Sequence, residues 1–272
     1  MSGPTRAVVT GATSGLGREL AAQLARRGWR VAITGRRADE LRETSRLVQE
    51  AGGEPMILGG SVTDDETVKG HYRMIKAAWG GLDYAVLNAG VGDSMHALEF
   101  RAEAYRWTFD TNVLGVCRWL EAIIPDMVAQ RSGVIAGVAS LAAFRGLPGS
   151  GPYSASKAAL VSLLESTRVD LRGTGVDVVT VCSGFVKSPM TDRNKPGTMP
   201  FIMETPAGAA AMLRGIDARR RIVHFPWQLS YATKYLLGNM PGFVYDRLAS
   251  RLAPMRRKKA SAEGAARLQG KP

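Results

Sequence analysis

Short apolar runs alternate with segments of helical periodicity along most of the chain. The apolar runs predict buried strands near residues 6–10, 30–34, 55–59, 83–88, 133–139, 176–182 and 221–224. The periodic segments predict helices near 15–28, 38–51, 64–79, 101–130, 153–172 and 205–218. Regular alternation of this kind predicts parallel strands joined by right-handed helical crossovers. We therefore expect one α/β domain with a doubly wound, parallel, seven-stranded sheet.

A glycine-rich turn follows the first predicted strand. Gly11, Gly15 and Gly17 have the spacing G-x-x-x-G-x-G and lie between an apolar run and an amphipathic one. Glycines at such a position permit a tight turn and let a pyrophosphate approach the backbone amides at a helix N-terminus. A glycine-rich turn can also simply connect a strand to a helix. Its place at the start of a strand–helix repeat favours a dinucleotide site.

Ser140, Tyr153 and Lys157 form the candidate catalytic group. In a helical segment, residues four apart share one face, so the Lys157 ammonium can lie beside the Tyr153 phenol. A free phenol has a pKa near ~10, and an adjacent cation favours the phenolate. Ser140, at the end of an apolar run, supplies a hydroxyl that can hold a substrate oxygen. The three residues indicate acid–base chemistry at a C–OH or C=O centre.

These motifs, with the sequence NAG at 88–90 and with Asn112, resemble the short-chain dehydrogenase/reductase family over about residues 5 to 225. The resemblance implies a Rossmann-type sheet of order 3-2-1-4-5-6-7 and a nicotinamide cofactor. It also implies that Tyr153 is the catalytic acid or base, that Ser140 orients the carbonyl, and that Lys157 binds the cofactor ribose and lowers the tyrosine pKa. In the family, the residue matching Asn112 props open a helix and positions a water in a proton relay. The alternative is a helix-interior residue with no catalytic part.

The cofactor preference is inferred from charge. NAD-preferring sites commonly have Asp or Glu about 20 residues beyond the glycine turn, where this chain has Arg36 and Arg37 after Gly35. A guanidinium can bind a 2′-phosphate that a carboxylate would repel, so we expect NADP(H) in preference to NAD(H). Alternatively, both arginines are solvated charges at the start of the next helix. The residues expected to bind the cofactor are Gly11, Thr13, Ser14, Gly15, Leu16, Gly17, Arg36, Arg37, Ser61, Val62, Asn88, Ala89, Gly90, Tyr153, Lys157, Gly184 and Val186.

Two positions depart from the family pattern. Ser61-Val62 stands where Asp-Val or Asp-Leu usually touches the adenine ring, and Ser183-Gly184 replaces Pro-Gly. Both substitutes keep groups that can form hydrogen bonds. We expect cofactor binding to survive, with altered adenine contacts and a less rigid nicotinamide loop.

Composition adds limits on location and metal binding. Cys117 and Cys182 lie in apolar stretches, which predicts buried thiols in a reducing compartment. The N-terminus has no apolar signal segment, and no run reaches the length of a membrane span, so we expect a cytoplasmic protein. His71, His96 and His224 have no ligand spacing, and we expect no metal site. We expect structural roles for His71 and His224, whereas His96 is either solvated or part of the substrate crevice.

Positive charge is concentrated near the C-terminus. Residues 214–272 contain thirteen Lys or Arg and three Asp or Glu, which accounts for most of the net charge of +12. We divide the chain into a catalytic domain, 1–226, and a basic, partly amphipathic extension, 227–272, with a disordered tail from about 256. Residues 227–259 mix aromatic and basic residues, so they fit an interfacial helix on an anionic membrane, a lid over the crevice, or a contact in a homodimer or homotetramer. No nucleic-acid-binding motif accompanies the charge.

The substrate is less well determined by the sequence. The Met-rich segment from Lys187 to about Glu204 fits either a hydrophobic, lipid-like carbonyl substrate or a lid that packs on its own core. The leading hypothesis is an NADP(H)-dependent carbonyl reductase or alcohol dehydrogenase. A 3-oxoacyl thioester reductase is the alternative among enzymes. A nucleotide-sensing or interaction protein on the same scaffold is the alternative from another class.

Overall fold

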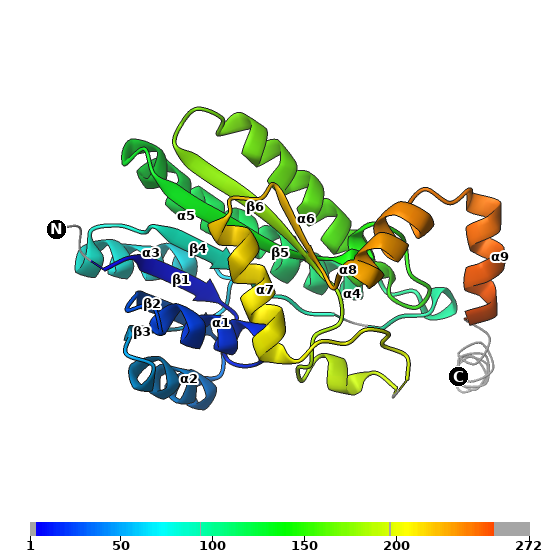
Figure 1. Cartoon of the computed structure of the whole chain (residues 1–272), viewed down its shortest axis with the longest axis horizontal. Helices are drawn as coiled ribbons and strands as arrows, with labels where there is room; N and C mark the ends of the chain where they lie inside the picture. Colours follow the sequence, from blue (N-terminus) through cyan, green and yellow to red (C-terminus); the bar gives the residue numbers. More distant parts are fainter. Residues whose placement is uncertain (1–3, 93, 196, 253–272) are drawn as a thin grey trace, which may run out of the picture.

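Seven parallel strands form one sheet in the order β3-β2-β1-β4-β5-β6-β7 (Figure 1). The structure is a computed structural model that describes residues 4–92, 94–195 and 197–252. Its strands confirm the sheet expected from the sequence, including the strand order. They are β1 (Arg6–Thr10), β2 (Arg30–Gly35), β3 (Glu54–Gly59), β4 (Tyr84–Leu87), β5 (Gly133–Ser140), β6 (Val176–Ser183) and β7 (Ile222–Phe225).

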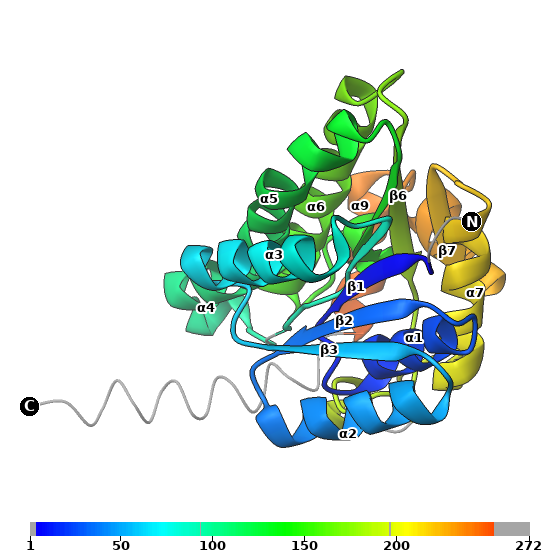
Figure 2. The ribbon, with the colours of Figure 1, turned by 90° about the vertical axis from the view of Figure 1, so that its left-hand side faces the viewer.

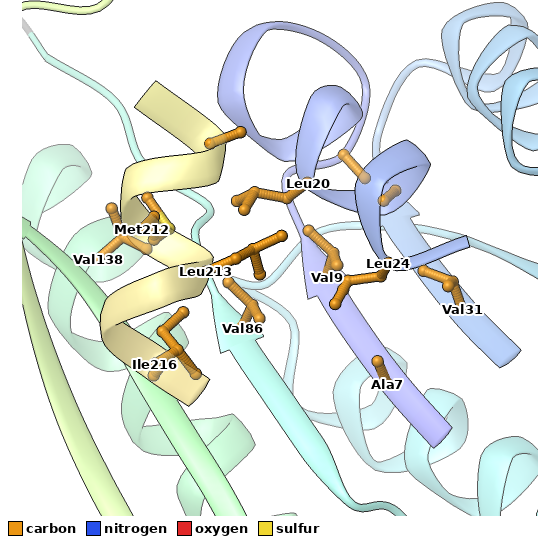
Figure 3. Packing of buried hydrophobic residues seen from close by; sticks show 14 of the residues in the cluster. Ala7, Val9, Leu20, Leu24, Val31, Val86, Val138, Met212, Leu213 and Ile216 are labelled. Atoms are coloured by element: carbon orange, nitrogen blue, oxygen red, sulfur yellow. The ribbon is translucent and has the colours of Figure 1, made fainter. Parts of the chain in front are cut away.

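Helices cover both faces of the sheet, as Figure 2 shows. On one face lie α1 (Gly15–Ala25), α2 (Ala38–Glu50) and α7 (Thr205–Asp217), and on the other α3 (Asp65–Trp79), α4 (Ala102–Phe109), α5 (Gly115–Ala129) and α6 (Gly151–Asp170). Each face has its own apolar core. Strand β1 shows the division, because Ala7 and Val9 belong to one core and Val8 to the other. In Figure 3, Leu20 of α1 and Met212 of α7 pack over β1 and its neighbours.

The helix expected over 101–130 is interrupted, which corrects the sequence prediction. A π-helical turn, η2 (Asp110–Leu114), separates α4 from α5. A Cβ at Gly115 would lie 2.8 Å from Val62 Cγ2, so α5 begins in close contact with the loop after β3. The side chain of Asn112, within the turn, is fully buried and hydrogen bonded. Inserted π turns of this kind are frequent at functional sites.

The segment after β7 is divided into three short pieces instead of one continuous helix. It consists of α8 (Trp227–Ser230), the π-helical η5 (Tyr231–Leu237) and α9 (Gly242–Leu252). The helix α8 passes directly into η5, and the chain leaves helical geometry between Leu237 and Gly242, where Gly238 and Pro241 are poor residues for a helix interior. The tail expected from about 256 lies outside the described residues. Within the described ranges, every helix is too short or too polar to cross a bilayer. The remaining short turns are η1 (Ala97–Glu99), η3 (Leu141–Ala143) and η4 (Thr191–Arg193).

Candidate active site

The motifs found in the sequence meet at the carboxyl edge of the sheet. The glycine turn follows β1, Asn88 follows β4, Ser140 ends β5, and Gly184 follows β6. The Asn88 side-chain amide donates to the carbonyls of Thr10, at 3.0 Å, and Gly11, at 3.3 Å, which holds the first two motifs together. Thr10 completes this link, because its hydroxyl accepts from the Ala89 amide at 2.9 Å. We did not single out Thr10 from the sequence, where it reads as the last residue of a buried strand.

The glycine turn packs closely against the loop after β4 and the start of α1. Gly11 has φ +66°, and a Cβ there would lie 2.8 Å from Ala89 Cα. A Cβ on Gly17 would lie 2.3 Å from the Gly11 carbonyl oxygen, so α1 starts in direct contact with the turn. Ser14 occupies the N-cap of α1 without a side-chain capping bond. The first amides of α1 therefore keep their capacity to bind an anion.

A pocket of about 520 Å³ adjoins this turn. It lies between the start of α1 and the loop after β6, and its lining includes Ser14, Gly15, Lys187 and Ser188. The Leu16 side chain is partly buried and packs against the core beneath. The shape of the turn fits the pyrophosphate of a dinucleotide, whereas the pocket also exposes the carboxylates of Glu19 and Asp192 and the apolar side chain of Leu47.

Arginine side chains surround the glycine turn. Arg37, which is exposed, donates to the hydroxyls of Thr13 at 2.7 Å and Ser14 at 3.0 Å. Arg36 beside it is exposed as well. Arg18, which the sequence analysis did not select, donates to the Thr13 carbonyl at 2.6 Å and also pairs with Glu40. The guanidinium of Arg37 thus lies next to the expected phosphate position and is not merely solvated.

The two departures from the family pattern have definite surroundings. The Ser61 hydroxyl is 2.8 Å from that of Thr63, so it is used within its own turn, and Val62 packs near the start of α5. The Gly184 amide donates to the Phe225 carbonyl at 2.7 Å, and a Cβ at Gly184 would lie 2.9 Å from Leu229 Cδ2. The loop after β6 is therefore fixed by β7 and α8, although it lacks the proline.

Downstream of Gly184, Val186 is buried and forms an isolated parallel bridge with Met203. Met203 also packs against the core, which supports the expectation that part of the Met-rich segment covers the protein's own interior. Met190 and Phe201 of the same segment are exposed. These two side chains are available to a bound molecule.

The candidate catalytic side chains converge around α6. Lys157 is 3% exposed, and its Nζ donates to the Val138 carbonyl on β5 at 2.7 Å. The same Nζ lies 5.7 Å from the centre of the Tyr153 ring. A Cβ at Gly90 would lie 3.3 Å from Asn112 Oδ1 and 3.4 Å from Nζ, so the loop after β4 passes close to both side chains. Ser140 accepts from the Ala142 amide at 3.1 Å, and its hydroxyl is 3.3 Å from the Ser183 carbonyl.

The direction of the tyrosine pKa differs from the expected one. Burial raises the pKa of Tyr153, and the hydrogen bond with Ser140 opposes this rise without cancelling it. Burial also lowers the pKa of Lys157 to about 8. Desolvation disfavours the charged form of both groups, which is why an adjacent lysine does not lower the phenol pKa in the protein alone.

Asn112 joins two parts of the site. Its side-chain amide donates to the Val91 carbonyl and to the Ser156 hydroxyl, both at 2.9 Å, and its oxygen accepts from the Val91 amide at 2.8 Å. The Ser156 hydroxyl in turn donates to the Tyr153 carbonyl at 2.8 Å. Asn112 thereby ties the loop after β4 to the helix that carries the tyrosine. No sequence signal pointed to Ser156, because a small polar residue between Tyr153 and Lys157 looks like any other residue of a helix.

The remaining cysteine and histidine predictions have mixed outcomes. Cys182 is buried as expected, whereas Cys117 is only half-buried. His71 is buried, with Nε2 3.2 Å from the Gly59 carbonyl, in keeping with a structural role. The Nδ1 of His96 accepts from the Leu98 amide at 3.2 Å and caps η1. The imidazole of His224 is partly buried, which lowers its pKa.

Comparisons with known proteins agree with this geometry. The model of the short chain dehydrogenase family matches residues 5–198. An uncharacterized oxidoreductase of Myxococcus xanthus is 46% identical over 248 residues, which cover 90% of this chain and 96% of that protein. The 3-oxoacyl-[acyl-carrier-protein] reductase FabG of Staphylococcus aureus is 33% identical over 68% of this chain and 76% of its own length. The crystal structure of a short chain dehydrogenase/reductase from Burkholderia phymatum, in complex with NAD, has a TM-score of 0.78 and 25% identity, and the match covers 86% of this chain and 92% of that one. The chain therefore belongs to the short-chain dehydrogenase family and is an NAD(P)-dependent oxidoreductase.

Proposed function

We propose that the protein transfers a hydride between NADP(H) and a hydrophobic carbonyl compound or secondary alcohol. The observation that carries this proposal is the arrangement of Ser140, Tyr153 and Lys157 beside a glycine turn whose rim holds Arg37. The nicotinamide ring, when bound, supplies or accepts the hydride. Every other step depends on side chains of this chain.

The proton is moved by Tyr153. During reduction, its phenol donates a proton to the carbonyl oxygen, and during oxidation the phenolate takes the proton from the alcohol. The Ser140 hydroxyl, which is fixed at the end of β5 by its contacts with Ala142 and Ser183, holds that oxygen in place. Lys157, whose Nζ is fixed by the Val138 carbonyl and lies near the Tyr153 ring, would bind the ribose of the cofactor. Asn112 and Ser156 hold the backbone of Tyr153 in register with the loop after β4.

Charge at the end of β2 supports the preference for NADP(H). Arg37 already bonds the hydroxyls of Thr13 and Ser14, so a 2′-phosphate beside the turn would meet a guanidinium that is held in position. Replacing Arg36 and Arg37 by Gln should weaken NADPH binding about ten- to hundredfold per lost contact and change NADH binding much less. Arg42→Gln, at an exposed arginine of α2 that pairs with Asp39, is the matched control for loss of charge. Tighter binding of NADH than NADPH by the wild type would overturn the preference.

A 3-oxoacyl thioester reductase is the second candidate, favoured by the similarity to the FabG protein. The two candidates differ in the substrate that is turned over. Purified protein should be assayed with apolar ketones, aldehydes and secondary alcohols, and in parallel with 3-oxoacyl thioesters, using both nucleotides. A kcat/KM at least tenfold higher for the thioesters would select the second candidate. No turnover of any compound, together with nucleotide binding, would favour a sensing role.

Assembly and location belong to the same proposal. We expect a homodimer or homotetramer in the cytoplasm, as is common for the family. Gel filtration of the purified protein and fractionation of cells that express it test these two expectations separately.

A further inference from the structure

The segment that follows β7 presents a row of exposed aromatic side chains. Trp227, Tyr231 and Tyr235 recur at intervals of four residues through α8 and η5, close to the repeat of a helix with π-type turns, so they lie along one side. The rings of Tyr231 and Tyr235 are 5.7 Å apart, centre to centre. Trp227 is 73% exposed, and Phe243 at the start of α9 is 78% exposed. We call Trp227, Tyr231, Tyr235, Leu236 and Phe243 the aromatic face.

The segment is attached to the domain by other residues. Ser230 and Thr233 are buried between the aromatic positions, and the Leu229 side chain packs against the apolar core. Farther along, the Tyr245 hydroxyl donates to the Gly146 carbonyl, and the Arg145 guanidinium lies 4.4 Å from the centre of the Tyr245 ring. The segment thus has an inner side that packs and an outer side that is apolar and exposed. Large apolar side chains exposed together on one short segment are typical of interaction sites.

Positive charge accompanies the aromatic face. Residues 227–252 contain Lys234, Arg247 and Arg251 against the single acidic residue Asp246. The chain continues past the end of α9 at Leu252 with twenty further residues, which include six Lys or Arg and one Glu. Four of these basic residues are consecutive at 256–259, within a few residues of α9. Aromatic side chains beside a polybasic run suit the headgroup region of an anionic bilayer.

We propose that the aromatic face binds an anionic membrane surface. A second copy of the chain is the other natural occupant, but a two-fold contact through this face would bring like charges together. A bilayer containing anionic lipids attracts that same charge. The protein would then lie on the membrane without crossing it. Tyr245 of α9 contacts Arg145 and Gly146, which belong to the loop between Ser140 and Tyr153. A membrane bound to the aromatic face would therefore lie near the substrate crevice, a consequence that rests on the proposed function.

The test is co-sedimentation of the full-length protein with phosphatidylcholine vesicles, with and without phosphatidylglycerol. We expect binding only to the anionic vesicles, weakening as salt is added. The double variant Trp227→Glu, Phe243→Glu should lower the partition coefficient more than tenfold. Met74→Glu is the matched control, because Met74 is 54% exposed on α3, at the opposite end of the molecule in Figure 1.

A second set of variants tests the same proposal without changing any residue of α8, η5 or α9. Replacing the four basic residues at 256–259 by Gln changes charge outside the described part of the chain. Binding should fall about fivefold per charge removed, the equivalent of about 1 kcal/mol each. Equal sedimentation of wild type with neutral and anionic vesicles, or of the double variant and wild type, would overturn the proposal. The proposal would also be overturned if the wild type did not bind vesicles and the double variant eluted from gel filtration as a smaller oligomer. That result would identify the aromatic face as a subunit contact. The measurement needs neither substrate nor nucleotide, so its failure is separate from a failure of the proposed function.

Discussion

Lys157 is a buried cation, and its replacement by methionine should stabilise the protein at neutral pH while it removes activity. The side chain is 3% exposed, and burial lowers the lysine pKa from its ordinary value of 10.5 to about 8. At about 1.36 kcal/mol per pH unit, holding the ammonium in the folded protein costs at most about 3 kcal/mol at pH 7. The lost hydrogen bond to the Val138 carbonyl offsets about 1–2 kcal/mol of this. We expect Lys157→Met to raise the free energy of unfolding by about 1–2 kcal/mol at pH 7.

The dependence on pH identifies the cause. A folded pKa below the unfolded one means that the unfolded chain binds more protons between about pH 8 and 10.5, so the wild type gains stability as pH rises through this range. Methionine has no proton to exchange. The advantage of the variant over the wild type should therefore shrink by about 2 kcal/mol between pH 7 and about pH 9.5.

The assay is urea unfolding followed by circular dichroism at both pH values, without nucleotide. Lys69→Met is the matched control, because the ammonium of Lys69, on α3, is half exposed and water solvates it in the folded and unfolded chain alike. Turnover and nucleotide affinity of Lys157→Met should both fall. A difference in unfolding free energy between wild type and variant that stays constant with pH would refute the reasoning, and so would a variant less stable than wild type at pH 7.

Three further predictions follow from the same geometry. Tyr153→Phe should lower kcat by roughly two to four orders of magnitude and leave the nucleotide Kd nearly unchanged, and a variant that keeps more than a tenth of wild-type turnover would contradict this. Because burial raises the Tyr153 pKa, the rate of alcohol oxidation by the wild type should increase with rising pH, whereas the rate of carbonyl reduction should not. Gly17→Ala places a Cβ 2.3 Å from the Gly11 carbonyl oxygen and should lower the free energy of unfolding, measured by urea unfolding, by about 1–3 kcal/mol. The control Gly70→Ala on α3, where a Cβ meets nothing within 4 Å, should raise it by about 0.5–1 kcal/mol. Arg145→Ala frees the loop after β5 from the C-terminal segment and should raise KM for the substrate at nearly constant kcat, which steady-state kinetics with saturating nucleotide would show.

The sequence determined the architecture because the signals for it are local. Each buried strand is a short apolar run and each crossover is a periodic helix, which together predict a parallel sheet. The same logic placed Gly11, Asn88, Ser140 and Gly184 together, since the carboxyl ends of parallel strands share one edge. The order of the strands was implied by the resemblance to the short-chain dehydrogenase/reductase family. Tyr153 and Lys157 could be paired from spacing alone, because one turn of helix separates them.

Tertiary contacts decided what local signals could not. The break in the helix at Asp110–Leu114 depends on the hydrogen bonds of Asn112 with residues 21 and 44 positions away, which no periodicity reveals. The direction of the Tyr153 pKa depends on how much water the fold removes around the phenol, and desolvation outweighs the nearby lysine. The sequence of the C-terminal segment shows one amphipathic stretch, yet its pieces are placed by the contact of Tyr245 with Gly146 and by the packing of Leu229 against the core. Periodicity records which residues are apolar, whereas burial, the partner of each polar group and the side left exposed are fixed only when distant segments pack together.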